Sequence, residues 1–296
     1  MEIKTIQSKS ILTPSKLPDT DFVINPYTGC RFGCSYCYAS FMSRYVGKDI
    51  KDWGEFVYVK ENAPELLKKD LDRLGASRSP EYGLKNKGKD KSIFISSVTD
   101  PYQGLEVKYR LTRRCLEVLL DWGFEGEVSI LTKSDLVLRD IDLFKQFNNV
   151  EVGLTVTSTD DTISRYFEKY APDVSKRFKA LKKLNEEGIR TYAFVGPLLP
   201  HFVSEPDKLD ALFEAIYKTG TKDLYVEHIN LSAYIVGRLK AEMPKLNKDI
   251  LGKFYMSQNK SYRDDLNKIV EDLVKKYRLN LRLGGTIYHR KNKVGR

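Results

Sequence analysis

Short apolar runs alternate with amphipathic helical patterns along most of this chain. Apolar runs typical of buried strands occur at 21–28, 92–98, 127–132, 150–157, 190–197 and 223–229. Apolar residues at helical spacing separate the later runs, at 108–121, 135–147, 173–187 and 206–218. Strands that alternate with helices of this length indicate βαβ units and a parallel sheet. The six units predict an α/β fold, an open, partial (β/α)6 TIM-like barrel of parallel strands.

The rest of the chain is expected to extend this barrel at both ends. We assign residues 1–20, which contain prolines and several Ser and Lys, to an extended N-terminal lead-in. The barrel is assigned to 21–230, and 231–296 to a helical C-terminal extension with a basic tail, all in one structural unit. Between the first two barrel strands, the patterns predict a short helix at 39–46, a strand at 55–60, a helix at 63–74 and a loop at 75–91.

Three of the four cysteines, Cys30, Cys34 and Cys37, fall within eight residues directly after the first predicted strand. Thiolates this close in sequence can converge on one metal centre, and soft sulfur ligands select iron–sulfur clusters, zinc or copper(I). Three ligands are one fewer than a closed structural site needs. If the centre is a four-iron cluster, one iron keeps an open position for a substrate or cofactor, which indicates chemistry.

Two other interpretations of these cysteines are a zinc knuckle and a redox dithiol. The histidines at 201, 228 and 289 are distant in sequence, so a closed zinc site would need a long-range fourth ligand. Cys34 and Cys37 alone would suffice for thioredoxin-like redox chemistry, which needs no third cysteine. Cys115 lies at helical spacing with leucines and is interpreted as a small buried hydrophobe, with a redox role as the alternative.

Composition is that of a globular protein with a full-sized core, with 41% apolar and 30% charged residues among 296. No uncharged apolar run of transmembrane length occurs, so no membrane partner is expected. The first residues lack the apolar core of a signal peptide. Bunched cysteines suit a reducing interior, which predicts a cytoplasmic location. The net charge of +10 is compatible with nucleic acid, although a solvated Lys/Glu-rich surface would give the same charge.

Polar residues follow five of the six predicted barrel strands. Ligands of parallel α/β folds bind at the carboxyl ends of the strands, so these residues are candidates for a site. Lys133 stands at one such end, where a cationic donor can hold a carboxylate, with a surface lysine as the alternative. Glu227 and His228 end the sixth strand, where contact with a substrate and satisfaction by neighbouring backbone are equally good interpretations.

The cysteine spacing, with an aromatic residue directly after Cys37, resembles the signature of the radical S-adenosylmethionine (SAM) superfamily. The resemblance implies the partial barrel, a [4Fe–4S] cluster on Cys30, Cys34 and Cys37, and SAM chelated to the remaining iron. It also implies reductive cleavage of SAM to a 5′-deoxyadenosyl radical that abstracts hydrogen from a substrate. In such enzymes the cofactor carries the difficult chemistry. A flavodoxin- or ferredoxin-type donor is expected to supply the electron, because no second Cys-rich motif occurs.

Further segments resemble the spore photoproduct lyase-like group, whose members are often labelled DNA-repair photolyases by similarity. They are the Asn25-Pro26-Tyr27 opening, Thr99-Asp100-Pro101-Tyr102-Gln103, Thr132-Lys133 with Arg139-Asp140, and Arg177 before Gly188. The likeness spans about residues 8–230. It implies that Tyr36 and Tyr38 flank the adenine and that Lys133 contacts the methionine carboxylate or ribose. The further expected contacts with SAM are Ser97, Asp100, Thr155, Thr157, Ser158 and Arg177.

One departure from that group bears on the reaction. Spore photoproduct lyase itself carries a further cysteine, a hydrogen donor, between its cluster motif and the next barrel strand. This chain has no cysteine from 38 to 114, so radical chemistry is expected but the spore-lesion reaction is not. Nucleic acid is the first candidate substrate, from the charge and the resemblance, with a peptide or small molecule as alternatives. The rival class is a non-catalytic, metal-stabilised nucleic-acid-binding protein, which would not need polar strand ends.

Overall fold

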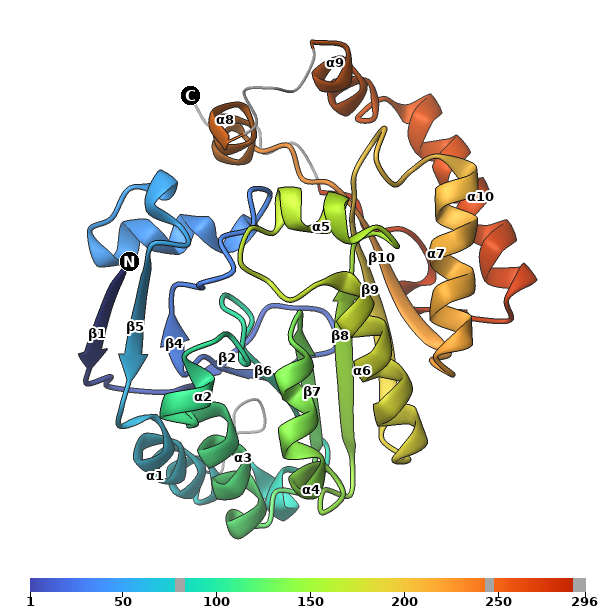
Figure 1. The fold of residues 1–296 in the computed structure, drawn as a ribbon. Coiled ribbons are helices and arrows are strands. Elements are labelled where there is room, and N and C mark those ends of the chain that lie inside the picture. Colours follow the sequence, from blue (N-terminus) through green and yellow to red (C-terminus); the bar gives the residue numbers. More distant parts are fainter. Residues whose placement is uncertain (78–82, 243–247, 290–296) are drawn as a thin grey trace.

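Eight strands form one sheet at the centre of the protein, in the order β11-β10-β9-β8-β7-β6-β3-β2 (Figure 1). The computed structural model describes residues 1–77, 83–242 and 248–289. Six neighbouring strands form the barrel and are parallel: β3 (Phe22–Ile24), β6 (Ser92–Ile95), β7 (Glu127–Thr132), β8 (Val150–Val156), β9 (Arg190–Leu198) and β10 (Asp223–His228), and β11 continues them in parallel beside β10. Within the described residues, β2 (Leu12–Pro14) and β11 (Asn280–Leu281) end the sheet on its two sides. The predicted open, partial barrel is confirmed.

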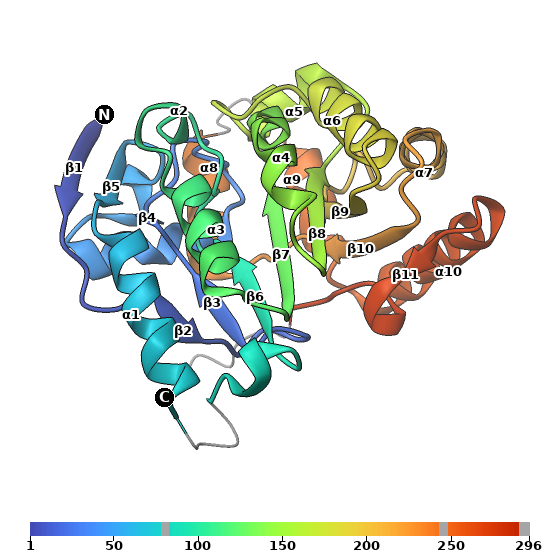
Figure 2. The ribbon, with the colours of Figure 1, turned by 90° about the horizontal axis from the view of Figure 1, so that it is seen from below.

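Helices cover the outer face of this curved sheet (Figure 2). β8 is buried at every position, because α6 packs on its outer side and the barrel interior lies on the other. The helices predicted between the strands are present as α3 (Leu111–Trp122), α6 (Val174–Glu186) and α7 (Pro206–Lys218), with the short α2 (Glu106–Tyr109) before α3. Each presents a buried apolar stripe to the sheet, as the 3.6-residue spacing predicted.

The region predicted as one helix over 135–147 is broken. It consists of a 3₁₀ helix, Asp135–Asp140, followed by the short α4 (Ile141–Phe144). Asp140 stands at the junction, is fully buried, and accepts a hydrogen bond of 2.9 Å from Arg113 of α3. This long-range ion pair fixes the chain at the junction, and nothing in the local apolar pattern reveals it.

A second, three-stranded sheet lies beside the barrel in the order β1-β5-β4. Its strands are β1 (Glu2–Ile6), β5 (Phe56–Lys60) and β4 (Tyr27–Thr28). β1 runs parallel to β5, whereas β2 runs antiparallel to β3 of the large sheet. Residues 1–20, predicted as an extended lead-in, thus contain two strands, each paired within a different sheet.

The predicted helices at 39–46 and 63–74 are both present, the first as a 3₁₀ helix. The first is the 3₁₀ helix Tyr38–Val46, and the second is α1 (Ala63–Gly75). Between them lies another 3₁₀ helix, Ile50–Asp52, which precedes β5. In the predicted loop over 75–91, residues 78–82 lie outside the described part of the chain. The described remainder of that loop contains the short 3₁₀ helix Lys85–Gly88.

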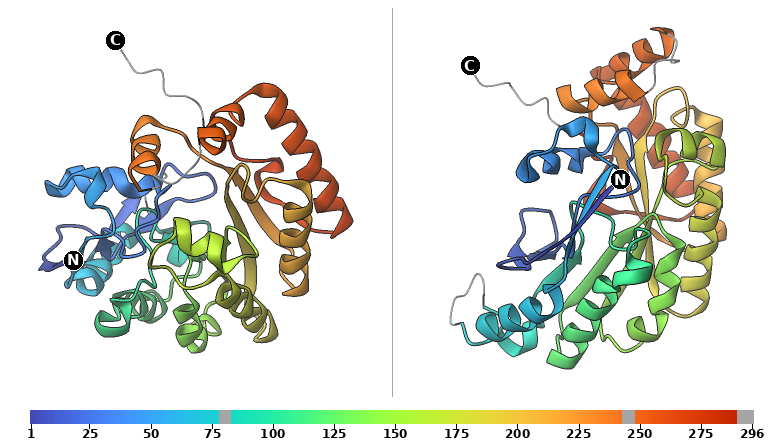
Figure 3. Two further views of the ribbon diagram at one scale, coloured as in Figure 1. Left: turned by 45° about the horizontal axis from the view of Figure 1, so that its top comes forward. Right: turned by 60° about the vertical axis from the view of Figure 1, so that its left-hand side comes forward.

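The C-terminal residues are helical, as predicted, in α8 (Ala233–Glu242), α9 (Lys248–Met256) and α10 (Lys260–Lys276). α10 packs against α7, and α8 packs against the 3₁₀ helix Ile50–Asp52 (Figure 3). The chain then returns to the sheet through β11 and the 3₁₀ helix Arg282–Gly284. None of the described helices is long and apolar enough to cross a membrane.

Arg282 joins the C-terminal segment to the amino end of β8 by pairing with Glu151. Its guanidinium donates to both carboxylate oxygens, at 3.0 Å and 2.7 Å, while the Glu151 side chain is 4% exposed. Ser129 donates to the same carboxylate at 2.8 Å. Burial alone would raise the pKa of Glu151, but the hydrogen bonds and charge of Arg282, together with Ser129 and Arg190, hold the pKa below its usual value.

Replacing this guanidinium is expected to destabilise the protein. Arg282→Met would leave the buried Glu151 carboxylate without its bidentate partner, and we expect a loss of about 3 kcal/mol in the free energy of unfolding, measured by urea denaturation. The loss should shrink as the pH falls below about 4.5, because a protonated carboxyl needs no cation. Adding Glu151→Gln to Arg282→Met should restore part of the stability. Equal stability of Arg282→Met and wild type at pH 7 would contradict this role.

Candidate active site

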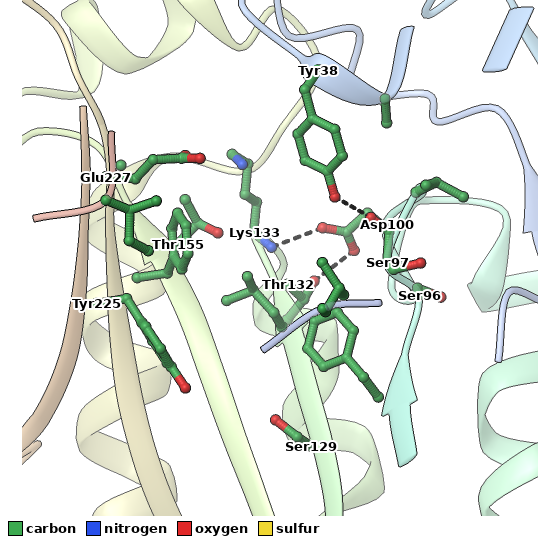
Figure 4. Close-up of a pocket in the computed structure, with 18 of the residues that line it drawn as sticks. Tyr38, Ser96, Ser97, Asp100, Ser129, Thr132, Lys133, Thr155, Tyr225 and Glu227 are labelled. Atoms are coloured by element: carbon green, nitrogen blue, oxygen red, sulfur yellow. Dashed lines mark hydrogen bonds between the residues drawn. The ribbon is translucent and has the colours of Figure 1, made fainter. Parts of the chain in front are cut away.

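A cavity of about 870 Å³ occupies the interior of the partial barrel, and Cys30, Cys34 and Cys37 all line it. Residues at the carboxyl ends of β6, β7 and β8 line the same cavity (Figure 4). Of the expected SAM contacts, those at the cavity are Tyr36, Tyr38, Ser97, Asp100, Lys133 and Thr155. The parallel strands therefore bring segments far apart in sequence to one place beside the cysteines.

The turn after β6 holds the cysteine loop in place. Thr99 Oγ1 and Gln103 Nε2 both donate to the carbonyl oxygen of Gly29, at 2.5 Å and 3.3 Å. Gln103 Oε1 accepts from the Arg31 backbone N–H at 2.8 Å. Gly29 itself has φ +88°, and a Cβ there would lie 2.5 Å from the carbonyl oxygen of Phe56. The loop thus requires glycine at this position and two polar side chains from the neighbouring strand end.

The C-terminal extension holds the same loop from the other side. Arg238 on α8 is buried and donates to the carbonyl oxygens of Cys34 and Gly33, at 3.0 Å and 3.4 Å. Tyr234, also on α8, donates its hydroxyl to the carbonyl oxygen of Tyr38 at 3.0 Å. The extension therefore contributes directly to the shape of the cysteine loop, which the sequence did not predict.

The three cysteines are unpaired, and Cys30 and Cys34 are buried. Burial raises the pKa of all three thiols, that of Cys34 to about 12, while the Lys133 ammonium opposes this at Cys34 and Cys37. Among the described residues, no three His, Cys, Asp or Glu side chains are arranged around the position of a single ion. An iron–sulfur cluster, whose cysteine ligands bind different irons, does not require that convergence. Three free thiols along one cavity wall are a donor set that fits such a cluster.

Asp100 fixes the start of the segment that carries Lys133. Its carboxylate accepts from Thr132 Oγ1 at 2.6 Å, the Lys133 backbone N–H at 2.9 Å and the Tyr102 backbone N–H at 2.9 Å. The Lys133 side chain extends into the cavity between β7 and the cysteine loop (Figure 4). Burial alone would lower the pKa of Lys133, but Cys34 and Glu168 raise it above its usual value. Lys133 is therefore a partly buried ammonium beside the cysteines.

Glu168 is fully buried beside this ammonium, where it accepts hydrogen bonds from two side chains and forms an ion pair with Lys133. Tyr36 donates its hydroxyl to one carboxylate oxygen, Arg177 donates its guanidinium to the other, and Lys133 Nζ lies 3.9 Å away. Burial alone would raise the pKa of Glu168, but Arg177 and Lys133 lower it below its usual value. Sequence reasoning missed Glu168, which follows α5 (Asp161–Phe167), a helix that no pattern predicted.

Three of the expected SAM contacts lie behind the cavity wall. Arg177 is fully buried, pairs with Glu168 and donates to the carbonyl oxygen of Thr155 at 3.2 Å. Ser158 Oγ accepts from the Asp160 backbone N–H at 3.0 Å, just before α5. The Thr157 hydroxyl is buried with no hydrogen-bond partner in the described part of the chain. In this structure, Arg177 positions groups that line the cavity and does not line it itself.

Glu227 and His228, which the sequence left undecided, have different environments. Glu227 lines the cavity, and its carboxylate lies 2.7 Å from Nε2 of His289, which raises the pKa of that histidine. His228 is buried among aromatic rings, with Nδ1 3.1 Å from the carbonyl oxygen of Ile229. Burial lowers the pKa of His228 to about 4. Only Glu227 of the two can meet a molecule in the cavity.

The family model of the radical SAM superfamily matches residues 24–213. The chain belongs to the radical SAM superfamily. An uncharacterized protein of Methanocaldococcus jannaschii is 39% identical to this radical SAM enzyme over 233 residues, which are 79% of this chain and 80% of that protein. Membership implies an iron–sulfur cluster and SAM as cofactors, and an external reductant, as radical SAM enzymes generally need.

Solved structures share the fold of this radical SAM enzyme. Spore photoproduct lyase complexed with dinucleoside spore photoproduct has a TM-score of 0.65 at 17% identity, covering 93% of this chain and 78% of that one. SuiB of Streptococcus suis bound to SAM has a TM-score of 0.54 at 15% identity, covering 90% of this chain and 50% of that one. The resemblance to spore photoproduct lyase is thus confirmed for the fold, at identities too low to carry a function.

Because His228 is buried and neutral, we expect the free energy of unfolding to depend on pH through this residue. Its pKa is about 4 in the folded protein and 6.5 in the reference state, so its contribution to stability is present above about 6.5 and is lost as the pH falls toward 4. Urea denaturation at pH 7 and pH 5 should show wild type losing more stability than His228→Phe. An equal loss in the two proteins would contradict a buried neutral imidazole.

Proposed function

We propose that this enzyme binds a [4Fe–4S] cluster through Cys30, Cys34 and Cys37 and uses SAM to abstract hydrogen from a substrate. The observation that carries the proposal is the placement of three free thiols and the Lys133 ammonium on the walls of one cavity. When bound, the cluster supplies the electron that cleaves the sulfonium of SAM and yields a 5′-deoxyadenosyl radical.

The chain's own residues would bind and orient SAM. Lys133 would hold the methionine carboxylate or the ribose through a charge-assisted hydrogen bond, and Glu168 keeps that lysine protonated. Tyr36, whose hydroxyl is fixed by Glu168, and Tyr38 would flank the adenine. Ser97, Asp100 and Thr155 are the further contacts at the cavity wall. We assign Arg177 a positioning role through Glu168, and we assign no contact to Thr157 and Ser158.

Nucleic acid is the substrate class that we propose. The net charge of +10 favours a polyanion, and the similar fold of spore photoproduct lyase has been solved with dinucleoside spore photoproduct. The reductant would be a flavodoxin or ferredoxin, since Cys115 is fully buried and no second Cys-rich motif is present. The reaction would be of lyase type, as in DNA repair, or of transferase type. Analysis of the products formed from the substrate distinguishes the two.

The radical reaction can be tested with reconstituted protein. After anaerobic reconstitution and reduction with dithionite, wild type should convert SAM to 5′-deoxyadenosine, quantified by chromatography. Cys34→Ala should lose this activity, because the cluster would lose a ligand. Cys115→Ala is the matched control and should keep it, since Cys115 lies away from the cavity. Zinc in place of iron, with no 5′-deoxyadenosine, would support the non-catalytic nucleic-acid-binding protein instead.

The same assay can test the substrate class. DNA, RNA and peptide pools, together with small-molecule extracts, would be added separately to the reduced enzyme. We expect DNA or RNA to raise the yield of 5′-deoxyadenosine above that of the enzyme alone. When the nucleic acid is labelled with deuterium, we expect deuterium in the 5′-deoxyadenosine. Stimulation by peptides or small molecules alone would overturn the proposed substrate class and leave the radical reaction intact.

Removing the Lys133 ammonium should weaken SAM binding. A hydrogen bond to a charged group contributes about 1.5–3 kcal/mol, so Lys133→Met should weaken SAM binding about tenfold to a hundredfold. The change is measured by equilibrium binding of SAM to reconstituted protein. Iron content equal to that of wild type would show that the cluster site is intact. Unchanged SAM affinity would contradict the role of Lys133.

A further inference from the structure

Trp53 has a buried indole N–H without a well-directed acceptor. The side chain follows the 3₁₀ helix Ile50–Asp52, is 4% exposed, and lines the cavity together with the three cysteines. Its Nε1 makes no hydrogen bond of good geometry in the described part of the chain, and its one weak contact of this kind is with the thiol of Cys37. A buried donor without an acceptor costs about 1–3 kcal/mol, so such a group calls for a physical explanation.

The indole is held rigidly against the cysteine loop. Its ring meets the ring of Phe56 edge-on, with centroids 6.1 Å apart and planes at 80°. The next residue, Gly54, packs on Gly33 of the loop so closely that a Cβ at Gly54 would lie 2.8 Å from the Gly33 Cα. Arg31 also donates to the Gly54 carbonyl oxygen at 2.8 Å. These contacts leave the indole little freedom to turn toward another acceptor.

The sulfur of Cys37 lies within reach of this donor. Both side chains line the cavity, Gly54 packs on the cysteine loop at Gly33, and a weak side-chain hydrogen bond joins Trp53 to the Cys37 thiol. An indole N–H donates and cannot accept, so it favours whichever state of a neighbouring sulfur carries more negative charge. Hydrogen bonds to the sulfurs are one of the factors that set the reduction potential of an iron–sulfur cluster.

We infer that the Trp53 N–H donates to the sulfur of Cys37, or to an adjacent sulfide, in the cluster-bound enzyme and raises the reduction potential of the cluster. The reduced cluster carries one more negative charge than the oxidised cluster, so the hydrogen bond stabilises the reduced state more. The inference rests on the proposed function, because it requires a cluster on Cys30, Cys34 and Cys37. Trp53 is a positioning and tuning residue and takes no part in bond breaking.

The two tryptophans of the chain allow a matched experiment. Trp122 lies on the surface, where its Nε1 donates to Asp72 at 3.0 Å, so Trp122→Phe makes the same chemical change away from the cavity. Wild type, Trp53→Phe and Trp122→Phe would be reconstituted and titrated with dithionite at controlled potential, with the reduced cluster followed by electron paramagnetic resonance. Iron and sulfide content would be measured for each protein.

We expect Trp53→Phe to shift the midpoint potential of the cluster to more negative values. If the hydrogen bond is ten times more favourable, as an equilibrium constant, in the reduced state than in the oxidised state, the shift is about 59 mV. Trp122→Phe should leave the potential unchanged. An unchanged potential in Trp53→Phe with a full complement of iron would overturn the inference and leave the proposed function standing. Absence of an iron–sulfur cluster in wild type would instead overturn both.

A second measurement covers the case in which Trp53→Phe loads no cluster. In the Trp122→Phe background, Trp53 is the only tryptophan, so biosynthetic incorporation of 3-benzothienylalanine replaces its N–H with sulfur and preserves the ring shape. The same negative shift of the potential is expected. A potential equal to that of the Trp122→Phe parent would show that the indole packs against the loop without donating, which would overturn the inference.

Discussion

The buried carboxylate of Glu168 links the parts of the candidate site to one another. Its three neighbours come from three segments: Tyr36 from the cysteine loop, Lys133 from the end of β7, and Arg177 from α6. Removing a buried charge from its partners costs several kcal/mol, so none of these segments can shift without a penalty from the others. One anion therefore fixes the distance between the cysteines and the strand end that carries the ammonium.

The cysteine loop is also held by hydrogen bonds to its backbone groups on its remaining sides. The Thr99 and Gln103 side chains bind it from the end of β6, and Arg238 binds it from the C-terminal extension. A loop restrained in this way can present three thiols with little reorganisation when a cluster binds, which is the condition for a preorganised site. The hydrogen-bond donors and cations around the loop would also offset part of the negative charge of such a cluster.

The C-terminal extension acts at both ends of the barrel. Arg238 supports the cysteine loop at the carboxyl ends of the strands, while Arg282 binds Glu151 near the amino ends. Tyr38, Glu227 and His289 add polar side chains to the lining of the cavity. The C-terminal extension thus helps to shape the candidate site through Arg238, although helices on the outside of a barrel often contribute only to its stability.

Local patterns in the sequence were enough to predict the barrel and to predict that the three cysteines and Lys133 lie together at the ends of its strands, where the structure places them on one cavity. Strand and helix periods report local burial, and parallel strands must end at the same edge, so polar residues such as Asp100 and Lys133 could be placed together in advance. Glu168 and Arg238 could not be, because both are held by contacts with segments distant in sequence. Glu168, for example, meets Tyr36 across 132 residues. Only the tertiary structure decided these partners, since a single long-range contact leaves no period in the sequence.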